Sequence, residues 1–225
     1  MSTSKTFFVN PRKQTILEEN TVMDPIKGDK ISFAQMDDLI KEIPYIQNCC
    51  SNKDRDKESL SYLIDRDLSQ SDCIKLGHAV EQYFTACVSK FTSLSNVRPK
   101  NEKGKKERDI LFKDDDRKIM YYTEVKTNLN LDTEKSKTTY EKCLLISEEY
   151  QLEDYDIEWC LLGARYTHSK EMPKKISKKY SSIKDNLFGV NEFLEMFSIN
   201  TSFTDQTYKT LLNNIANSCF NSNSS

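Results

Sequence analysis

Residues 108–127 read RDILFKDDDRKIMYYTEVKT, and the centre of the fold is predicted from this stretch. It contains two runs of strand character, at about residues 108–112 and 118–127, on either side of a polar turn with three consecutive aspartates. This order predicts an antiparallel hairpin. Glu124 and Lys126 are two residues apart, so their side chains point to the same face of the second strand.

Asp109 lies at the start of the first predicted strand. We therefore expect Asp109, Glu124 and Lys126 to converge at one place on the hairpin. Two carboxylates and a lysine are well suited to a divalent metal and a phosphate, because Mg²⁺ prefers one or two protein carboxylates and keeps waters and phosphate oxygens as its other ligands. The alternative is a structural ion-pair site in which Lys126 balances the acidic pair.

A helix is predicted upstream of the hairpin, at about residues 71–91. Glu81 lies on its apolar stripe, where a carboxylate is costly unless it is paired or bound to a ligand. Glu81 is therefore either a further site residue or a salt-bridge partner. The other positions of the stripe are Ile74, Gly77, Phe84, Val88 and Phe91.

A second helix is predicted after the hairpin, from residue 132 or 133 to about 149, with Tyr140, Leu144 and Leu145 as its apolar positions. Residues 157–164 (IEWCLLGA) then form an apolar run of strand length, typical of a central strand buried on both faces. An antiparallel pair followed by a helical crossover predicts a right-handed connection to a parallel strand. The predicted fold class is α/β, with a central mixed β-sheet flanked by helices.

Further helices are expected at both ends of the chain. Ser32 and Gln35 have the spacing of a capping box, which predicts a helix over about residues 32–45. Other helices are predicted at about residues 57–67, 191–197 and 204–220. The 225 residues suit a single domain. Its expected parts are a core at about 71–166, an N-terminal helical region at about 1–70 and a C-terminal helical region at about 167–225.

The formal net charge of −2 conceals two basic segments, residues 98–108 and 165–184. They suggest a local surface for a polyanion, although solvated lysine-rich loops are the alternative. The seven cysteines form no C-x-x-C pattern, and no signal peptide or long apolar run is visible. These features favour a reduced cytoplasmic compartment and no membrane contact.

Asp109, a hairpin and then Glu124-Val125-Lys126, with Glu81 on an upstream helix, resemble the PD-(D/E)XK nuclease superfamily. The order of helix, hairpin and crossover is also similar, over roughly residues 71–166. Residues 124–135 further resemble the segment after the motif in some Type II restriction endonucleases. One departure is Arg108, which stands where the family has proline.

The resemblance implies that Asp109, Glu124 and the backbone carbonyl of Val125 bind Mg²⁺, and that Mn²⁺ can replace it. It implies that Lys126 assists the attacking water, with Glu81 as an outer or second-metal ligand. The expected activity is sequence-specific cleavage of double-stranded DNA to 5′-phosphate ends. A homodimer is expected, because a palindromic double-strand break needs two such sites, and a cognate DNA methyltransferase would be encoded elsewhere.

Candidate DNA-binding residues follow the motif or lie in the second basic segment. They are Asn128, Asn130, Lys135, Arg165, Lys174 and Lys175. Two other functions stay open. One is a repair or phage nuclease of the same fold without sequence specificity. The other is a non-catalytic nucleic-acid-binding protein. The chain has no phosphate-binding glycine loop, which disfavours a nucleotide-driven motor.

Overall fold

The computed structural model describes residues 29–47, 68–98, 108–131, 133–151 and 155–220. Within these ranges a five-stranded sheet has the order β1-β2-β3-β4-β5. Strands β1, β2 and β3 are antiparallel neighbours, whereas β3, β4 and β5 are parallel. The strands are β1 (Ser95–Asn96), β2 (Ile110–Asp114), β3 (Ile119–Lys126), β4 (Asp156–Gly163) and β5 (Leu187–Phe188). The predicted α/β class with a mixed sheet is confirmed.

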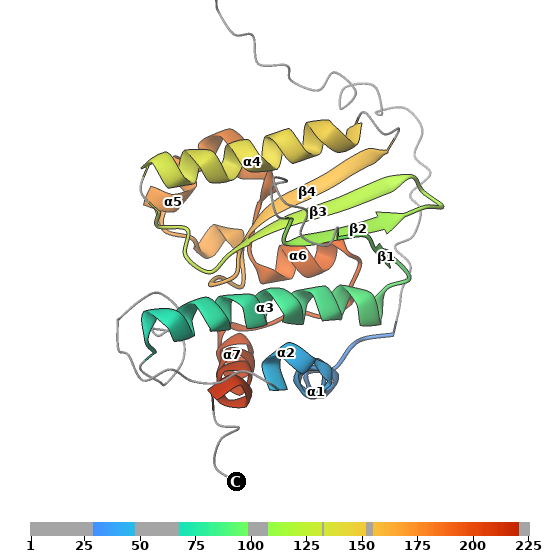
Figure 1. The fold of residues 1–225 in the computed structure, drawn as a ribbon, viewed down its shortest axis with the longest axis vertical. Helices are drawn as coiled ribbons and strands as arrows, with labels where there is room; N and C mark the ends of the chain where they lie inside the picture. Colours follow the sequence, from blue (N-terminus) through green and yellow to red (C-terminus); the bar gives the residue numbers. More distant parts are fainter. Residues whose placement is uncertain (1–28, 48–67, 99–107, 132, 152–154, 221–225) are drawn as a thin grey trace, which may run out of the picture.

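Helices cover both faces of the sheet (Figure 1). α4 lies on one face, and α6 and α3 lie on the other, with α1, α2 and α7 beyond α3. The helices are α1 (Phe33–Glu42), α2 (Pro44–Gln47), α3 (Gln70–Phe91), α4 (Thr133–Gln151), α5 (Lys174–Lys179), α6 (Val190–Met196) and α7 (Asp205–Phe220). Two 3₁₀ turns, η2 (Ser169–Glu171) and η3 (Ser181–Asn186), flank α5.

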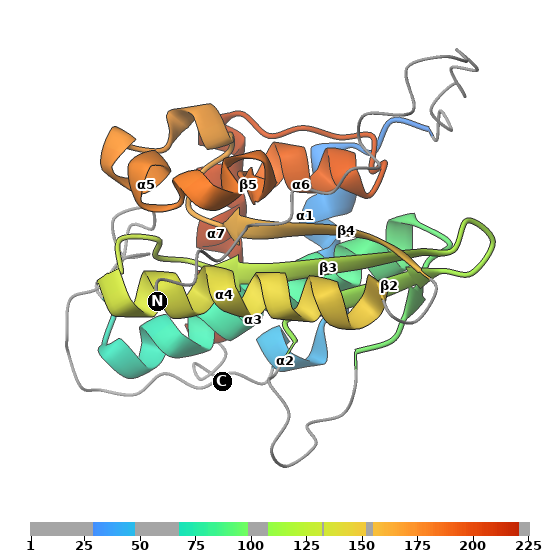
Figure 2. The same cartoon turned by 90° about the horizontal axis from the view of Figure 1, so that it is seen from above.

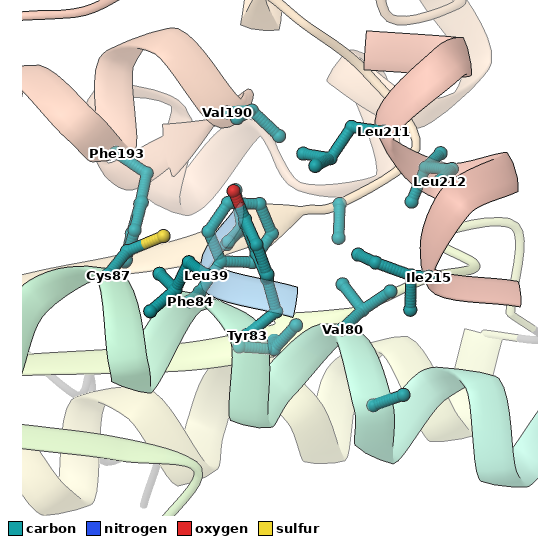
Figure 3. Packing of buried hydrophobic residues seen from close by; sticks show 14 of the residues in the cluster. Leu39, Val80, Tyr83, Phe84, Cys87, Val190, Phe193, Leu211, Leu212 and Ile215 are labelled. Carbon is teal, nitrogen blue, oxygen red and sulfur yellow. The ribbon is translucent and has the colours of Figure 1, made fainter. Parts of the chain in front are cut away.

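The largest core fills the space between the sheet and the helices α1, α3, α6 and α7. Figure 3 shows side chains from these four helices meeting in one layer. The hydroxyl of Tyr83 donates to the carbonyl of Met36 at 2.8 Å, which ties α3 to α1. The hydroxyl of Tyr208 donates to the carbonyl of Ala164 at 2.6 Å, which ties α7 to the end of β4. These two bonds satisfy polar groups that would otherwise be costly inside a core.

Strand alternation divides the hairpin between two cores. Phe112, Tyr121 and Val125 face the large core under the sheet. Tyr122 lies in the smaller core under α4, together with Leu111, Met120, Cys143, Ile146 and Tyr150. Because side chains alternate along a strand, Glu124 and Lys126 share the face of Tyr122 and point toward α4.

Most predicted elements are present, with small shifts at their ends. The expected helix over 32–45 is interrupted at Ile43, although its capping box is confirmed by the bonds between Ser32 and Gln35. Two short strands, β1 and β5, were not predicted. The expected helix at 57–67 lies outside the described residues. The apolar run of β4 is fully buried only in its second half, from Cys160 onward.

Two predicted apolar faces are wrong in part. Ile74 is 58% exposed, because the buried stripe of α3 passes through Leu76 and Val80 instead. On α4, Leu144 and Leu145 are exposed. The residues of α4 that face the sheet core are Cys143, Ile146 and Tyr150.

Candidate active site

Four charged side chains from three segments meet under α4. Asp109 immediately precedes β2, Glu124 and Lys126 are on β3, and Lys142 is on α4. The ammonium group of Lys126 lies 2.7 Å from Oε1 of Glu124 and 4.0 Å from Oδ2 of Asp109. The ammonium group of Lys142 lies 2.5 Å from Oε2 of Glu124 and 3.9 Å from Oδ1 of Asp109. Each lysine therefore approaches both carboxylates, and the cluster has two charges of each sign.

Backbone and tyrosine groups fix the two carboxylates. The amide of Val125 donates to Oδ2 of Asp109 at 2.8 Å. The hydroxyl of the fully buried Tyr122 donates to Oε2 of Glu124 at 2.8 Å. The N–H and C=O of a strand residue point to the same side of the strand, so the carbonyl of Val125 is directed toward the side on which Asp109 lies.

Burial and charge act differently on the two acids. Burial raises the pKa of Asp109 to about 6, the negative charge of Glu124 adds to this, and Lys126 and Lys142 oppose it. For Glu124, burial also disfavours the charged form, but Lys126 and Lys142 outweigh it and lower its pKa below the ordinary value. Such paired acids with pKa values displaced in opposite directions are a feature of functional sites.

Lys126 is held in its charged form. Burial by itself would lower the pKa of this lysine, but Glu124 and Asp109 outweigh burial and raise the pKa above its usual value. The side chain is still 31% accessible, and it lines an open cavity of about 530 Å³ next to the start of α4. The cluster is thus buried on the side of Glu124 and reaches the surface at Lys126.

The pair of carboxylates has the chemistry of a hard-cation site. A cation, the Lys126 ammonium, already lies within 4.0 Å of both acids. Mg²⁺ prefers oxygen ligands of this kind and keeps several waters. The donor set of Asp109, Glu124 and the Val125 carbonyl fits such an ion. Within the described ranges, no group of three or more His, Cys, Asp or Glu side chains is arranged to hold a metal.

Glu81 is not part of this cluster. It lies on α3, which packs against the opposite face of the sheet. Its carboxylate forms an ion pair with Arg98, and Nδ1 of His78 is 3.7 Å away. Glu81 is buried, as its place on the apolar stripe predicted, and its ion-pair partners among the described residues are Arg98 and His78.

The candidate DNA-binding residues occupy different places. Lys135 lines the same cavity as Lys126. Lys174 and Lys175 are exposed on α5, and Arg165 is half-buried. Asn128 and Asn130 follow β3, where the side-chain oxygen of Asn128 accepts from the amide of Asn130 at 2.8 Å and shapes the turn.

Sequence reasoning missed Lys142 and Tyr122. Tyr122 is two residues before Glu124, so strand alternation places it on the same face, and this was a usable signal. Lys142 precedes Cys143, which has the i, i+3, i+7 spacing with Ile146 and Tyr150 that marks the buried side of α4. The predicted apolar stripe through Leu144 and Leu145 was wrong, so the side of α4 that carries Lys142 was not recognised as facing the sheet.

Searches with the sequence and the structure found no matching protein-family model, no matching curated protein and no matching solved structure. None of the helices in the described residues has the length and apolar character needed to cross a membrane.

Proposed function

We propose that this chain is a divalent-metal-dependent DNA endonuclease that hydrolyses phosphodiester bonds at the cluster of Asp109, Glu124, Lys126 and Lys142. The observation that carries the proposal is the convergence of two buried carboxylates with two lysines at the end of a strand, where the cluster opens to the surface beside Lys126. The chemistry that Mg²⁺ supplies at such a site is activation of a bound water and neutralisation of developing negative charge.

Each residue then has a distinct role. Asp109 and Glu124 bind the metal through their oxygens, and Tyr122 fixes the orientation of Glu124. Lys126 is the accessible lysine, and its raised pKa keeps it protonated. It therefore suits orientation of the attacking water and neutralisation of the phosphate better than removal of a proton. Lys142 balances the charge of Glu124 from the other side.

The finer proposal is a sequence-specific enzyme of the Type II restriction class, acting on double-stranded DNA as a homodimer. A nuclease of the same fold without sequence specificity is the nearest alternative. Digestion of a long plasmid with Mg²⁺ separates them, since discrete fragments indicate site-specific cleavage and a smear indicates the alternative. End mapping should find 5′-phosphate ends.

A second function is favoured by one observation. The two carboxylates are already balanced by two lysines, so the cluster can also be a structural element of a non-catalytic nucleic-acid-binding protein. This function predicts salt-dependent DNA binding without hydrolysis in Mg²⁺ or Mn²⁺. The plasmid digest decides between the two, with Glu124→Gln as the inactive control for contaminating nuclease.

A further inference from the structure

The cavity beside Lys126 extends the cluster along the first turns of α4. It has a volume of about 530 Å³ and is open to solvent, and its lining consists of Lys126, Leu131, Glu134, Lys135, Thr138 and Thr139. Lys126 belongs to both the cavity and the carboxylate cluster. A molecule in the cavity would therefore lie next to the acids.

One face of α4 connects the cavity with the cluster. Lys135, Thr139 and Lys142 are spaced by four and three residues, so they lie along the same side of the helix. Lys135 and Thr139 line the cavity, and Lys142 contacts Glu124. At 1.5 Å per residue the distance along the axis from Lys135 to Lys142 is roughly 10 Å, which equals about three base-pair steps measured along the axis of a DNA duplex.

The rim of the cavity is also tied to a basic helix. Lys179 at the end of α5 donates to the carbonyl of Leu131, which lines the cavity. Both cartoon views place α5 at the end of the molecule where α4 begins (Figures 1 and 2). The other lysines of α5 are Lys174, Lys175 and Lys178. These lysines add positive charge near this end of the molecule, and Glu134 is the one acidic side chain among the described residues that line the cavity.

We propose that this cavity binds the phosphodiester backbone of one nucleic-acid strand, next to the bond that the cluster cleaves. The proposal rests on the nuclease function and adds a substrate subsite to it. Lys126 and Lys135 supply charge for the phosphates, while Leu131 and the threonine methyl groups offer apolar contact to the sugars. Phosphate contacts of this kind position the strand without reading its sequence.

Three charge-changing variants of α4 test the subsite. Lys135→Ala removes a cavity lysine, Glu134→Gln removes the opposing acid, and Lys137→Ala is the matched control. Lys137 is on the same helix but exposed, 3.7 Å from Glu141, and does not line the cavity. Binding of a fluorescein-labelled duplex, and of one of its strands alone, is measured by anisotropy in EDTA over a range of salt concentrations.

Lys135→Ala should weaken binding roughly five-fold at about 0.1 M salt and reduce the salt slope by about 1, because one phosphate contact is lost. Glu134→Gln should tighten binding, and Lys137→Ala should leave it unchanged. Equal binding by Lys135→Ala and Lys137→Ala would overturn the subsite. Thr138→Trp, which fills the cavity without a change of charge, should also weaken binding; unchanged binding would count against the subsite.

Cleavage of plasmid with Mg²⁺ by the same preparations reports the proposed function separately. If the wild-type protein cleaves but the Lys135 and Lys137 variants bind alike, the subsite fails and the nuclease function stands. If Lys135→Ala weakens binding but the wild-type protein does not cleave, the cavity binds nucleic acid and the nuclease function fails.

Discussion

Lys142 of α4 and Glu124 of β3 form an ion pair at 2.5 Å, and this pair joins the crossover helix to the strand that carries Glu124 and Lys126. The side chain of Glu124 is 2% accessible and that of Lys142 is 17% accessible. Since an uncompensated charge inside a protein is costly, each member depends on the other. Because Lys142 compensates the charge of Glu124, a shift of α4 would change the electrostatic balance of the cluster.

Lys142→Met should destabilise the metal-free protein by roughly 3 kcal/mol, because it leaves two buried carboxylates with one lysine. A divalent cation should restore part of this loss by taking over the compensation of Glu124. Thermal unfolding in EDTA and in excess Mg²⁺ measures both effects, with Lys137→Met as the exposed control on the same helix. Equal losses in the two buffers would contradict a cation site at Glu124.

Asp109 and Glu124 should respond to pH in opposite directions. The pKa of Asp109 is about 6 in the folded protein, above its ordinary value of 3.8, so the folded state binds this proton more tightly than the unfolded state does. Its contribution to stability is therefore lost as pH rises from about 4 to about 6. Glu124 has a lowered pKa, so its contribution is present at neutral pH and is lost as pH falls below about 4.5.

Replacing each carboxyl group by an amide, which does not titrate, makes these two pH dependences measurable. In EDTA, the free energy of unfolding of Asp109→Asn should increase relative to that of wild type by roughly 2 kcal/mol as pH rises from about 4 to about 7. Glu124→Gln should instead lose stability relative to wild type as pH rises over the same range. Chemical denaturation at about pH 4 and about pH 7 gives the free energy of unfolding of each variant relative to wild type. The same direction of change with pH in both variants would contradict the opposite pKa shifts of Asp109 and Glu124.

The two buried tyrosines near the cluster form a natural comparison. Tyr122 donates to Glu124, whereas the hydroxyl of Tyr180 has no hydrogen-bond partner in the described part of the chain. Tyr122→Phe should cost about 2 kcal/mol, because a hydrogen bond to a charged group is lost. Tyr180→Phe should cost nothing or stabilise slightly. Urea unfolding of both variants checks this, and equal costs would contradict the bond to Glu124.

Glu81 should contribute to stability but not to Mg²⁺ binding. Its carboxylate pairs with Arg98 on the far side of the sheet from Asp109 and Glu124. Glu81→Gln should therefore lower stability, while Mg²⁺ affinity measured by calorimetry changes less than about two-fold, or roughly 0.4 kcal/mol. A loss of Mg²⁺ binding comparable to that of Glu124→Gln would place Glu81 in the metal site after all.

Local patterns were sufficient to predict the hairpin and its charged face. Strand alternation is a strict two-residue period, so the side on which Glu124 and Lys126 lie follows from their spacing. The partners of these residues depend on packing between segments distant in the sequence. The contact of Lys142 with Glu124 depends on the rotation of α4 about its axis, and the pairing of Glu81 depends on the path of the chain to Arg98.

Metal-dependent cleavage by paired variants measures directly whether Glu124 is needed for hydrolysis. An end-labelled DNA fragment is incubated with Mg²⁺ and wild-type protein, Glu124→Gln or Lys137→Met, each shown to be folded by its thermal transition. Wild type and Lys137→Met should cleave the fragment, whereas Glu124→Gln should lose about a thousand-fold or more in rate, or roughly 4 kcal/mol of transition-state stabilisation. Cleavage by Glu124→Gln at the wild-type rate, or none by wild type in either Mg²⁺ or Mn²⁺, would contradict the proposed function.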